Sequence, residues 1–134
     1  MTDSFVKIAG CVVEEYGKFL LVQEKKPSAY GLWNLPAGRV DAGETVELAA
    51  AREMKEESGY EVELVKKLGT YRTSTHELHI FQAKIISGEL EFPQDELLDA
   101  QWFSYDEIQA FGKEEKLRGA FVLESLNDYF AIAQ

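Results

Sequence analysis

Two runs of apolar and β-branched residues near the N-terminus predict that the chain begins with extended strands. The runs span Phe5–Glu14 and Lys18–Lys25, and the tripeptide EYG that separates them ends at Gly17. Glycine adopts a positive φ at little cost, so this pattern is typical of a β-hairpin with Gly17 in the turn. We therefore expect two antiparallel strands at the start of the domain.

A segment of strong helix formers follows a long stretch that has the composition of a loop. The loop, KKPSAYGLWNLPAGRVDAGE, contains two of the three prolines, and long ordered loops usually carry function. The helix is expected over about Thr45–Ser58. Thr45 can cap its first turn, and Gly59 can end it in a left-handed conformation.

The second half of the chain combines further strands with two more helices. Strands are expected at Glu61–Tyr71, at Glu77–Ile86 and around Gln101–Phe103. Helices are expected from roughly Ser104 and over about Glu115–Ile132, where apolar residues recur on one face. Strands and helices do not alternate strictly. We therefore expect an α+β fold in which a mixed β-sheet is sandwiched between α-helices.

The composition is that of a soluble globular protein, with 46% hydrophobic and 28% charged residues. We expect residues 1–134 to form a single domain, since this length is common for one. No apolar run approaches the roughly 20 residues that cross a bilayer, and the first residues do not resemble a signal peptide. We therefore expect a cytoplasmic protein with no membrane partner. The lone Cys11 lies in an apolar run and is expected to be buried.

The charge balance restricts the class of partner. The chain has 24 acidic and 14 basic residues, which gives a formal net charge of −10. Such a protein repels polyanions, so we expect no long nucleic acid as partner. A small anionic substrate would need a bridging cation. The oligomeric state is left open between a monomer and a homodimer.

The stretch REMKEESGY places three carboxylates on one side of the predicted central helix. A residue advances about 100° around an α-helix, so Glu53, Glu56 and Glu57 fall within one narrow arc. Like charges at this spacing destabilise a helix, and hard divalent cations prefer oxygen ligands such as these. A metal site would explain the crowding. The alternative is a face that is acidic only because it is solvated.

The spacing of residues around this helix resembles a known family. Gly38 is followed by five residues, then Glu44, then seven residues and REMKEESGY. This resembles the box of the Nudix hydrolases, G-x5-E-x7-R-E-U-x-E-E-x-G-U, in which U is apolar. All fixed positions match, and Tyr60 stands where an aliphatic residue is usual. The resemblance implies the Nudix fold and hydrolysis of a pyrophosphate bond with Mg²⁺, or with Mn²⁺ as a substitute.

The same resemblance implies roles for the residues of the helix. Glu56 and Glu57 would bind the metal. Glu53 would be a further ligand or the group that orients and deprotonates the attacking water. Arg52 would hold one of these glutamates in position through its planar guanidinium group. A surface ion pair is the simpler role for Arg52.

Residues outside this helix complete the set of candidates. Gly38 would contribute to the metal site through its backbone, and Glu44 would be a metal ligand or would fix the loop. Glu96, in PQDELLDAQWF, is the alternative general base. Trp33 and Tyr30, in AYGLWNLP, are candidates to stack on a substrate ring, and core packing is the alternative for Trp33. The catalytic candidates are therefore Arg52, Glu53, Glu56 and Glu96.

The stretches LWNLPAGRVDAGET, QWFSYDEI and LRGAFVLES resemble small bacterial members that accept nucleoside di- and triphosphates or the diphosphate of the thiamine pyrimidine. The preferred substrate is therefore a nucleoside di- or triphosphate, or a similar small organic diphosphate. A pyrophosphatase for ADP-ribose or another nucleotide sugar is an alternative, but Pro93 lies too far from the box to match that group. A non-catalytic nucleotide or metabolite sensor and a plain acidic scaffold are two further hypotheses.

Overall fold

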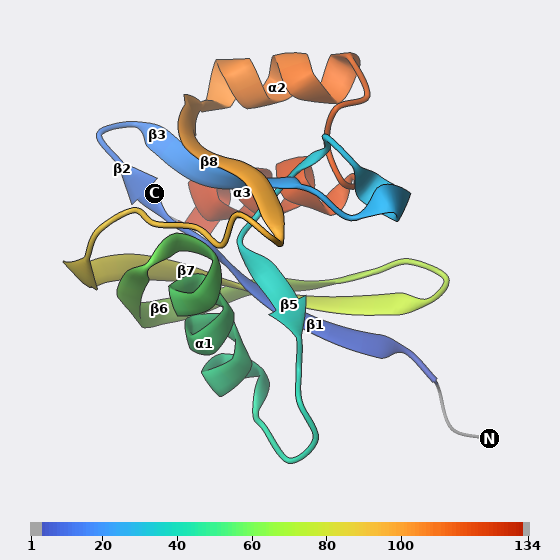
Figure 1. Ribbon diagram of the computed structural model, residues 1–134, viewed down its shortest axis with the longest axis vertical. Coiled ribbons are helices and arrows are strands. Elements are labelled where there is room, and N and C mark those ends of the chain that lie inside the picture. The colour runs from blue at the N-terminus through green and yellow to red at the C-terminus, as the bar shows by residue number, and fades with distance from the viewer. Residues whose placement is uncertain (1–3, 133–134) are drawn as a thin grey trace.

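The structure is a computed structural model that describes residues 4–132. In this part of the chain the strands are β1 (Val6–Val12), β2 (Glu14–Glu15), β3 (Lys18–Glu24), β4 (Trp33–Asn34), β5 (Ala37–Arg39), β6 (Tyr60–Arg72), β7 (His76–Gly88) and β8 (Leu97–Ser104). The helices are α1 (Val46–Ser58), α2 (Tyr105–Lys113) and α3 (Phe121–Ile132), and a 3₁₀ turn covers Pro27–Ala29. Figure 1 shows their arrangement.

The strands form two sheets. In the first sheet the order is β5-β1-β7-β6, with β1 parallel to β7 and the other pairs antiparallel. In the second sheet, β3 pairs with β2, β4 and β8, and all three pairings are antiparallel. The first sheet is therefore mixed and the second antiparallel.

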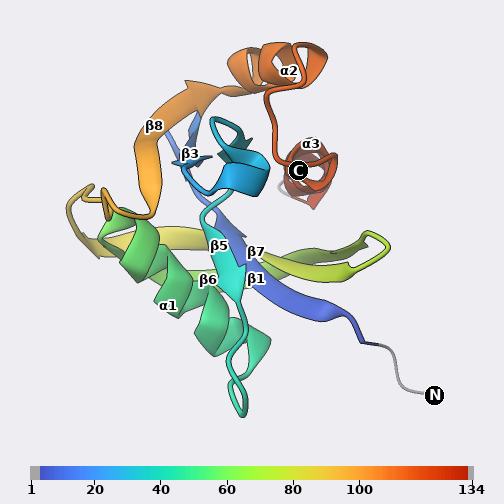
Figure 2. The ribbon, with the colours of Figure 1, turned by 45° about the vertical axis from the view of Figure 1, so that its right-hand side comes forward.

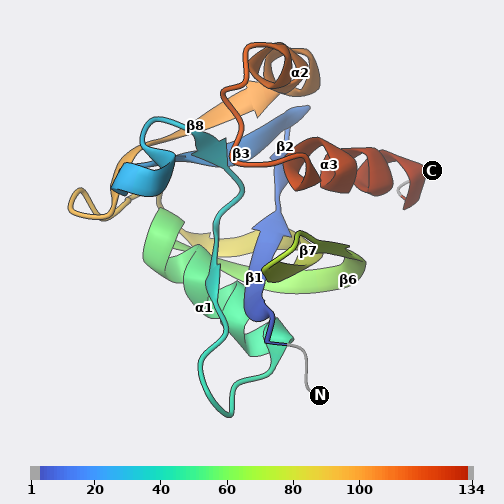
Figure 3. The ribbon, with the colours of Figure 1, turned by 90° about the vertical axis from the view of Figure 1, so that its right-hand side faces the viewer.

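Two helices cover opposite faces of the first sheet (Figures 2 and 3). Side chains of a strand alternate between the faces, and β1 follows this rule. Ile8 and Val12 pack in the cluster that contains α3, whereas Cys11 packs in the cluster that contains α1. Burial raises the pKa of the Cys11 thiol to about 12. The predicted α+β fold, a mixed sheet between helices, is confirmed.

The central helix forms as its local sequence predicts. Helix α1 begins after Thr45, whose side-chain oxygen accepts a hydrogen bond from the Leu48 N–H at 3.1 Å. It ends at Gly59, which has a φ of 82° and donates its N–H to the Lys55 carbonyl at 2.9 Å. Within residues 4–132, none of the helices combines the length and apolar character needed to span a bilayer.

The structure corrects two of the expected elements. The predicted hairpin is reduced to the short β2–β3 pair. Strand β1 instead pairs with β7 in the first sheet, where its buried side chains pack on both faces of that sheet. The last helix begins at Phe121 instead of near Glu115. The preceding residues pair with a distant strand: Trp33 donates to the Lys116 carbonyl and accepts from the Arg118 N–H, both at 2.8 Å.

Candidate active site

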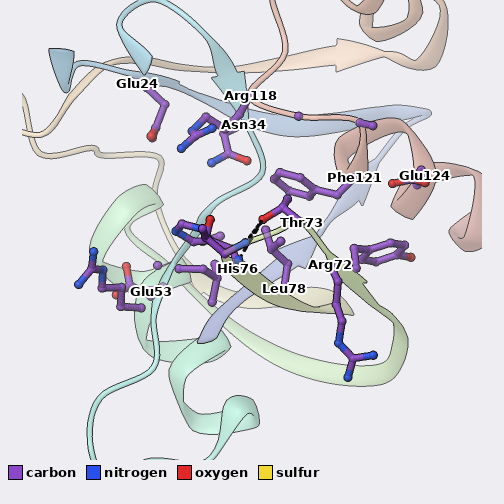
Figure 4. A pocket seen from close by; sticks show the side chains of 18 of the residues that line it. Glu24, Asn34, Glu53, Arg72, Thr73, His76, Leu78, Arg118, Phe121 and Glu124 are labelled. Carbon is purple, nitrogen blue, oxygen red and sulfur yellow. Dashed lines mark hydrogen bonds between the residues drawn. The ribbon is translucent and has the colours of Figure 1, made fainter. Parts of the chain in front are cut away.

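A cavity of about 580 Å³ lies between the second sheet, the β5 strand, the tip of the β6–β7 hairpin and the segment before α3. Its lining includes Gly38, Glu53 and Glu57 from the acidic part of the chain. Figure 4 shows Glu53 on one side of the cavity, and Glu24, Asn34 and Arg118 drawn above it. The cavity has the size of a small-molecule site.

Strand β5 and helix α1 approach each other closely at this cavity. The Glu57 carboxylate accepts a hydrogen bond from the Ala37 N–H at 2.8 Å. A Cβ atom built on Gly38 would overlap with the carboxyl group of Glu53. The glycine therefore provides the space in which the Glu53 carboxylate lies.

Arg52 organises the acidic residues around it. Its guanidinium donates to both oxygens of Glu44, at 2.8 and 2.9 Å, and to Glu53 at 2.8 Å. It also contacts Glu56 at 3.2 Å and donates to the Arg39 carbonyl at 2.9 Å. A planar group with several fixed donors can hold such a set together, and a lysine cannot.

Arg52 and burial act in opposite directions on the nearby carboxylates. The hydrogen bond from Arg52 lowers the pKa of Glu44 to about 2. Burial raises the pKa of Glu53, although Arg52 opposes the shift. Burial also raises the pKa of Glu57 well above its ordinary value, and the charges of Glu53, Glu24 and Glu96 add to this effect. Glu53 and Glu57 are therefore carboxylates whose negative charge the protein compensates poorly.

These donors suit a hard divalent cation. Glu53 and Glu57 offer carboxylate oxygens to the cavity, and the missing Gly38 side chain leaves room beside them. Within residues 4–132, no three acidic, imidazole or thiol side chains already converge on a common metal position. Glu56 is exposed, lies outside this cavity and contacts Arg52. The chemistry of the donors fits Mg²⁺ or Mn²⁺.

Two more of the predicted residues lie where they can influence this site. Glu96 is exposed, and its negative charge contributes to the raised pKa of both Glu53 and Glu57. Glu44 accepts hydrogen bonds from Arg52 and from the Asp41 N–H at 3.0 Å. In this structure, the contacts of Glu44 are those of a residue that fixes the loop.

The two aromatic candidates lie away from the cavity. Trp33 is 9% exposed and packs in the core, 4.8 Å from the Phe103 ring and 5.9 Å from the Phe111 ring. Tyr30 is 63% exposed, and the lining of the cavity includes neither residue. The expectation that they stack on a substrate therefore lacks support, and the structure shows core packing for Trp33.

Three polar residues of the cavity were not among the candidates from the sequence. Asn34 left a weak signal, because it places a polar side chain among the apolar residues of LWNLP. Glu24 left none, because its two neighbours in the sequence are polar as well. Arg118 left none, because its place depends on the backbone pairing with Trp33.

The chain matches known proteins over most of its length. A family model described as NUDIX domain matches residues 5–122. The "Phosphatase NudJ" of Shigella boydii is 35% identical over 125 residues, which are 89% of this chain and 79% of that protein. A NUDIX hydrolase from Nitrosomonas europaea has a similar structure, with a TM-score of 0.85 at 28% identity, over 95% of this chain and 89% of that one.

Two further relatives are longer than the matched region. The "Putative 8-oxo-dGTP diphosphatase" of Bacillus subtilis is 37% identical over 102 residues, 75% of this chain and 66% of that protein. The "Putative nudix hydrolase 1" of Caenorhabditis elegans is 41% identical over 108 residues, 75% of this chain and 27% of that protein. This chain thus spans less than two thirds of the length of both proteins.

Proposed function

This chain belongs to the Nudix family, and from that premise we propose that it is a divalent-metal-dependent pyrophosphohydrolase. Its substrate would be a nucleoside di- or triphosphate or a related small organic diphosphate. The observation that carries the proposal is the pair of poorly compensated carboxylates, Glu53 and Glu57, facing one cavity beside Gly38. Two relatives named as a diphosphatase and a phosphatase support this class of reaction.

A divalent cation bound here would neutralise charge on the phosphoryl oxygens and lower the pKa of a bound water. Glu53 and Glu57 would hold it from the cavity side, and Glu56 from the outer side. The Gly38 backbone and Glu44 remain proposed contributors. Arg52 would fix the orientation of Glu53 and Glu56, to which it donates hydrogen bonds.

One carboxylate must accept the proton of the attacking water. Glu53 supports this role because burial raises its pKa above the ordinary value, which makes its carboxylate a stronger base. Glu96 is the alternative base, since its charge is felt at Glu53. Because Glu53 is also a proposed metal ligand, Glu53→Gln should lower turnover under either assignment. Glu96→Gln separates the two, since it should lower kcat strongly only if Glu96 is the base.

The cavity can take an anionic substrate although the protein carries a formal charge of −10. Basic side chains lie among its lining residues, and these are Lys26, Arg39, Arg72 and Arg118. They reduce the local repulsion that a di- or triphosphate would otherwise meet. The reacting phosphates would lie toward Glu53 and Glu57.

The proposal is tested by measuring phosphate and pyrophosphate release from a panel of nucleotides with Mg²⁺. Turnover should require the cation and fall about a thousandfold in Glu57→Gln, the range seen when one electrostatic catalytic group is lost. Glu63→Gln is the matched control, because Glu63 is exposed on β6. Nucleotide binding without product release would instead indicate a sensor.

A further inference from the structure

Glu24, Asn34 and Arg118 lie outside the acidic motif but line the same cavity as Glu53. They come from three neighbouring segments. Strands β3 and β4 pair side by side, and Trp33 on β4 hydrogen-bonds with the backbone of Arg118. Figure 4 draws all three side chains on the side of the cavity above Glu53. The second sheet therefore brings together polar groups that are distant in sequence.

Two of these residues have unused capacity to accept hydrogen bonds. The Asn34 Oδ1 atom is the one buried side-chain nitrogen or oxygen within residues 4–132 that has no hydrogen-bond partner. Glu24 is only 7% exposed, and its carboxylate contacts Lys26 at 3.4 Å, longer than a strong charge-assisted hydrogen bond. Buried acceptors normally have donors, so a ligand that supplies N–H groups would complete them.

The third residue has the opposite chemistry. Arg118 carries only donors, and the Asn34 amide nitrogen is a further donor, so the group combines acceptor oxygens with N–H donors. A ligand edge that matches this set has an exocyclic amino group beside an acceptor atom of the ring. The apolar side chains of Leu78 and Phe121 line the same cavity and offer a surface for a flat ring.

We propose that Glu24, Asn34 and Arg118 form a subsite that selects substrates whose nitrogen heterocycle carries an exocyclic amino group. Glu24 and Asn34 accept from the amino group, and Arg118 donates to the neighbouring ring acceptor. The inference rests on the proposed function, because it concerns the organic part of the same substrate. The negative charge of Glu24 disfavours a phosphate here, which leaves the phosphates to the side of Glu53 and Glu57.

Matched nucleotide pairs test recognition of the amino group and of the ring acceptor beside it. Cytidine and uridine triphosphates differ at C4, where an amino group replaces an oxygen, and at the adjacent N3, which accepts a hydrogen bond in cytosine and donates one in uracil. Guanine and hypoxanthine triphosphates differ by one amino group. The kcat/KM ratio within a pair should favour the amino-bearing ring by about tenfold or more, because a pocket built for a hydrogen bond rejects a substrate that lacks it. Whichever pair shows the larger ratio identifies the preferred ring.

Variants of the subsite should reduce this ratio in graded steps. Glu24→Gln keeps one acceptor oxygen and should lower the kcat/KM ratio in part. Glu24→Met and Asn34→Leu remove acceptors and should bring it close to one. Glu124→Gln is the control, since Glu124 is exposed and lines the cavity at a distance from the other three in Figure 4. Ratios near one in the parent, or ratios unchanged in Glu24→Met and Asn34→Leu, overturn the proposal.

A binding measurement separates this inference from the proposed function. The unphosphorylated nucleosides cytidine, uridine, guanosine and inosine are titrated into metal-free protein and followed by NMR. Selective shifts with the amino-bearing nucleosides, lost in Glu24→Met, support the subsite even if no substrate is hydrolysed. Magnesium-dependent turnover with no discrimination in either assay would leave the proposed function standing and overturn the subsite. Neither turnover nor nucleoside binding would overturn both.

Discussion

The carboxyl group of Glu53 occupies the space that a side chain on Gly38 would fill. The three atoms nearest to a Cβ built on Gly38 all belong to that carboxylate. The φ of Gly38 is not in the left-handed region, so the backbone conformation does not require glycine at this position. Glycine is needed here for space alone. Position 38 on strand β5 must leave room for the carboxyl group of Glu53, which projects from helix α1.

Gly38→Ala should therefore damage activity more than folding. The added methyl group would push the flexible end of Glu53 aside, and a displacement of ~1 Å in a catalytic group costs roughly a hundredfold in rate. The melting temperature should change little, because the fold keeps its backbone. Both are measured by steady-state kinetics with Mg²⁺ and by thermal unfolding.

Gly112→Ala is the matched control for this variant. Gly112 lies on α2 and does not line the cavity. A Cβ added there would also meet the flexible end of a side chain, that of Leu123, at 2.9 Å. Activity near the parent level is expected there. If Gly38→Ala were equally active, the space beside Glu53 would have no catalytic importance.

Arg52→Lys should impair the site although it keeps the positive charge. One ammonium group cannot reproduce the hydrogen bonds at 2.8 to 2.9 Å to Glu44, Glu53 and the Arg39 carbonyl. Residues that orient metal ligands typically contribute about 10- to 100-fold, and kcat should fall by that factor. The loss of charged hydrogen bonds should also lower stability by about 1–3 kcal/mol.

Lys55→Gln is the control for the Arg52 variant. It removes a positive charge from the same helix, and the exposed contacts of Lys55 are long, at 3.7 Å to Glu61 and 3.3 Å to the Gly59 carbonyl. Such surface pairs contribute little, so kinetics and stability should stay close to those of the parent. A lysine at position 52 that preserved kcat would show that charge alone suffices.

Trp33 and Tyr30 should respond to truncation in opposite ways. Trp33→Ala removes a ring packed on Phe103 and Phe111 and should cost about 3–5 kcal/mol in the free energy of unfolding. Tyr30→Ala removes an exposed ring outside the cavity and should change stability by less than about 0.5 kcal/mol. Denaturant unfolding measures both. A rise in KM for Tyr30→Ala would restore the substrate-stacking role that the structure does not support.

The parts of the fold that can be predicted are those set by neighbours in sequence. The sequence predicts helix α1 correctly because its cap, Thr45, and its end, Gly59, act within a few residues of the helix. The placement of Glu53 and Glu57 on one side of the helix also follows from helical spacing, whereas Glu56 lies outside the cavity that they line. Local rules therefore account for the acidic side of the candidate site.

The remainder depends on contacts between distant segments. Strand β1 leaves its neighbour in sequence to pair in parallel with β7, a choice that no turn signal encodes. The late start of α3 depends on the pairing of Trp33 with Lys116 and Arg118. The same pairing brings Arg118 to the cavity. Trp33 is likewise buried because aromatic rings from distant segments pack around it, which the loop-like composition of its own segment does not predict.

The stability contributed by the start of α2 should depend on pH. The Glu107 carboxylate accepts a hydrogen bond from the Ser104 N–H at 2.9 Å, and this backbone bond lowers the pKa of Glu107 below its ordinary value of 4.5. A lowered pKa means that the unfolded chain binds the proton more tightly. The contribution is therefore full above pH 4.5 and is lost as pH falls through the lower, folded pKa.

Glu107→Gln removes this charge and should lower the melting temperature near neutral pH. As pH falls below 4.5 and through the lower, folded pKa of Glu107, the difference between the two proteins should shrink. Glu63→Gln, at an exposed position on β6, is the control and should change the melting temperature less. A penalty for Glu107→Gln that grew in acid would contradict the lowered pKa.

Glu57→Gln should abolish stabilisation by divalent cations without harming the metal-free fold. The glutamine oxygen can still accept the hydrogen bond of the Ala37 N–H, and a neutral amide suits a position where burial disfavours a charge. In the parent, a cation at a hundred times its dissociation constant should stabilise by about 2.7 kcal/mol. Thermal unfolding is followed through a Mg²⁺ titration at constant ionic strength. Saturable stabilisation should appear in the parent and in Glu63→Gln but not in Glu57→Gln. Equal stabilisation of all three proteins would remove Glu57 from the metal site.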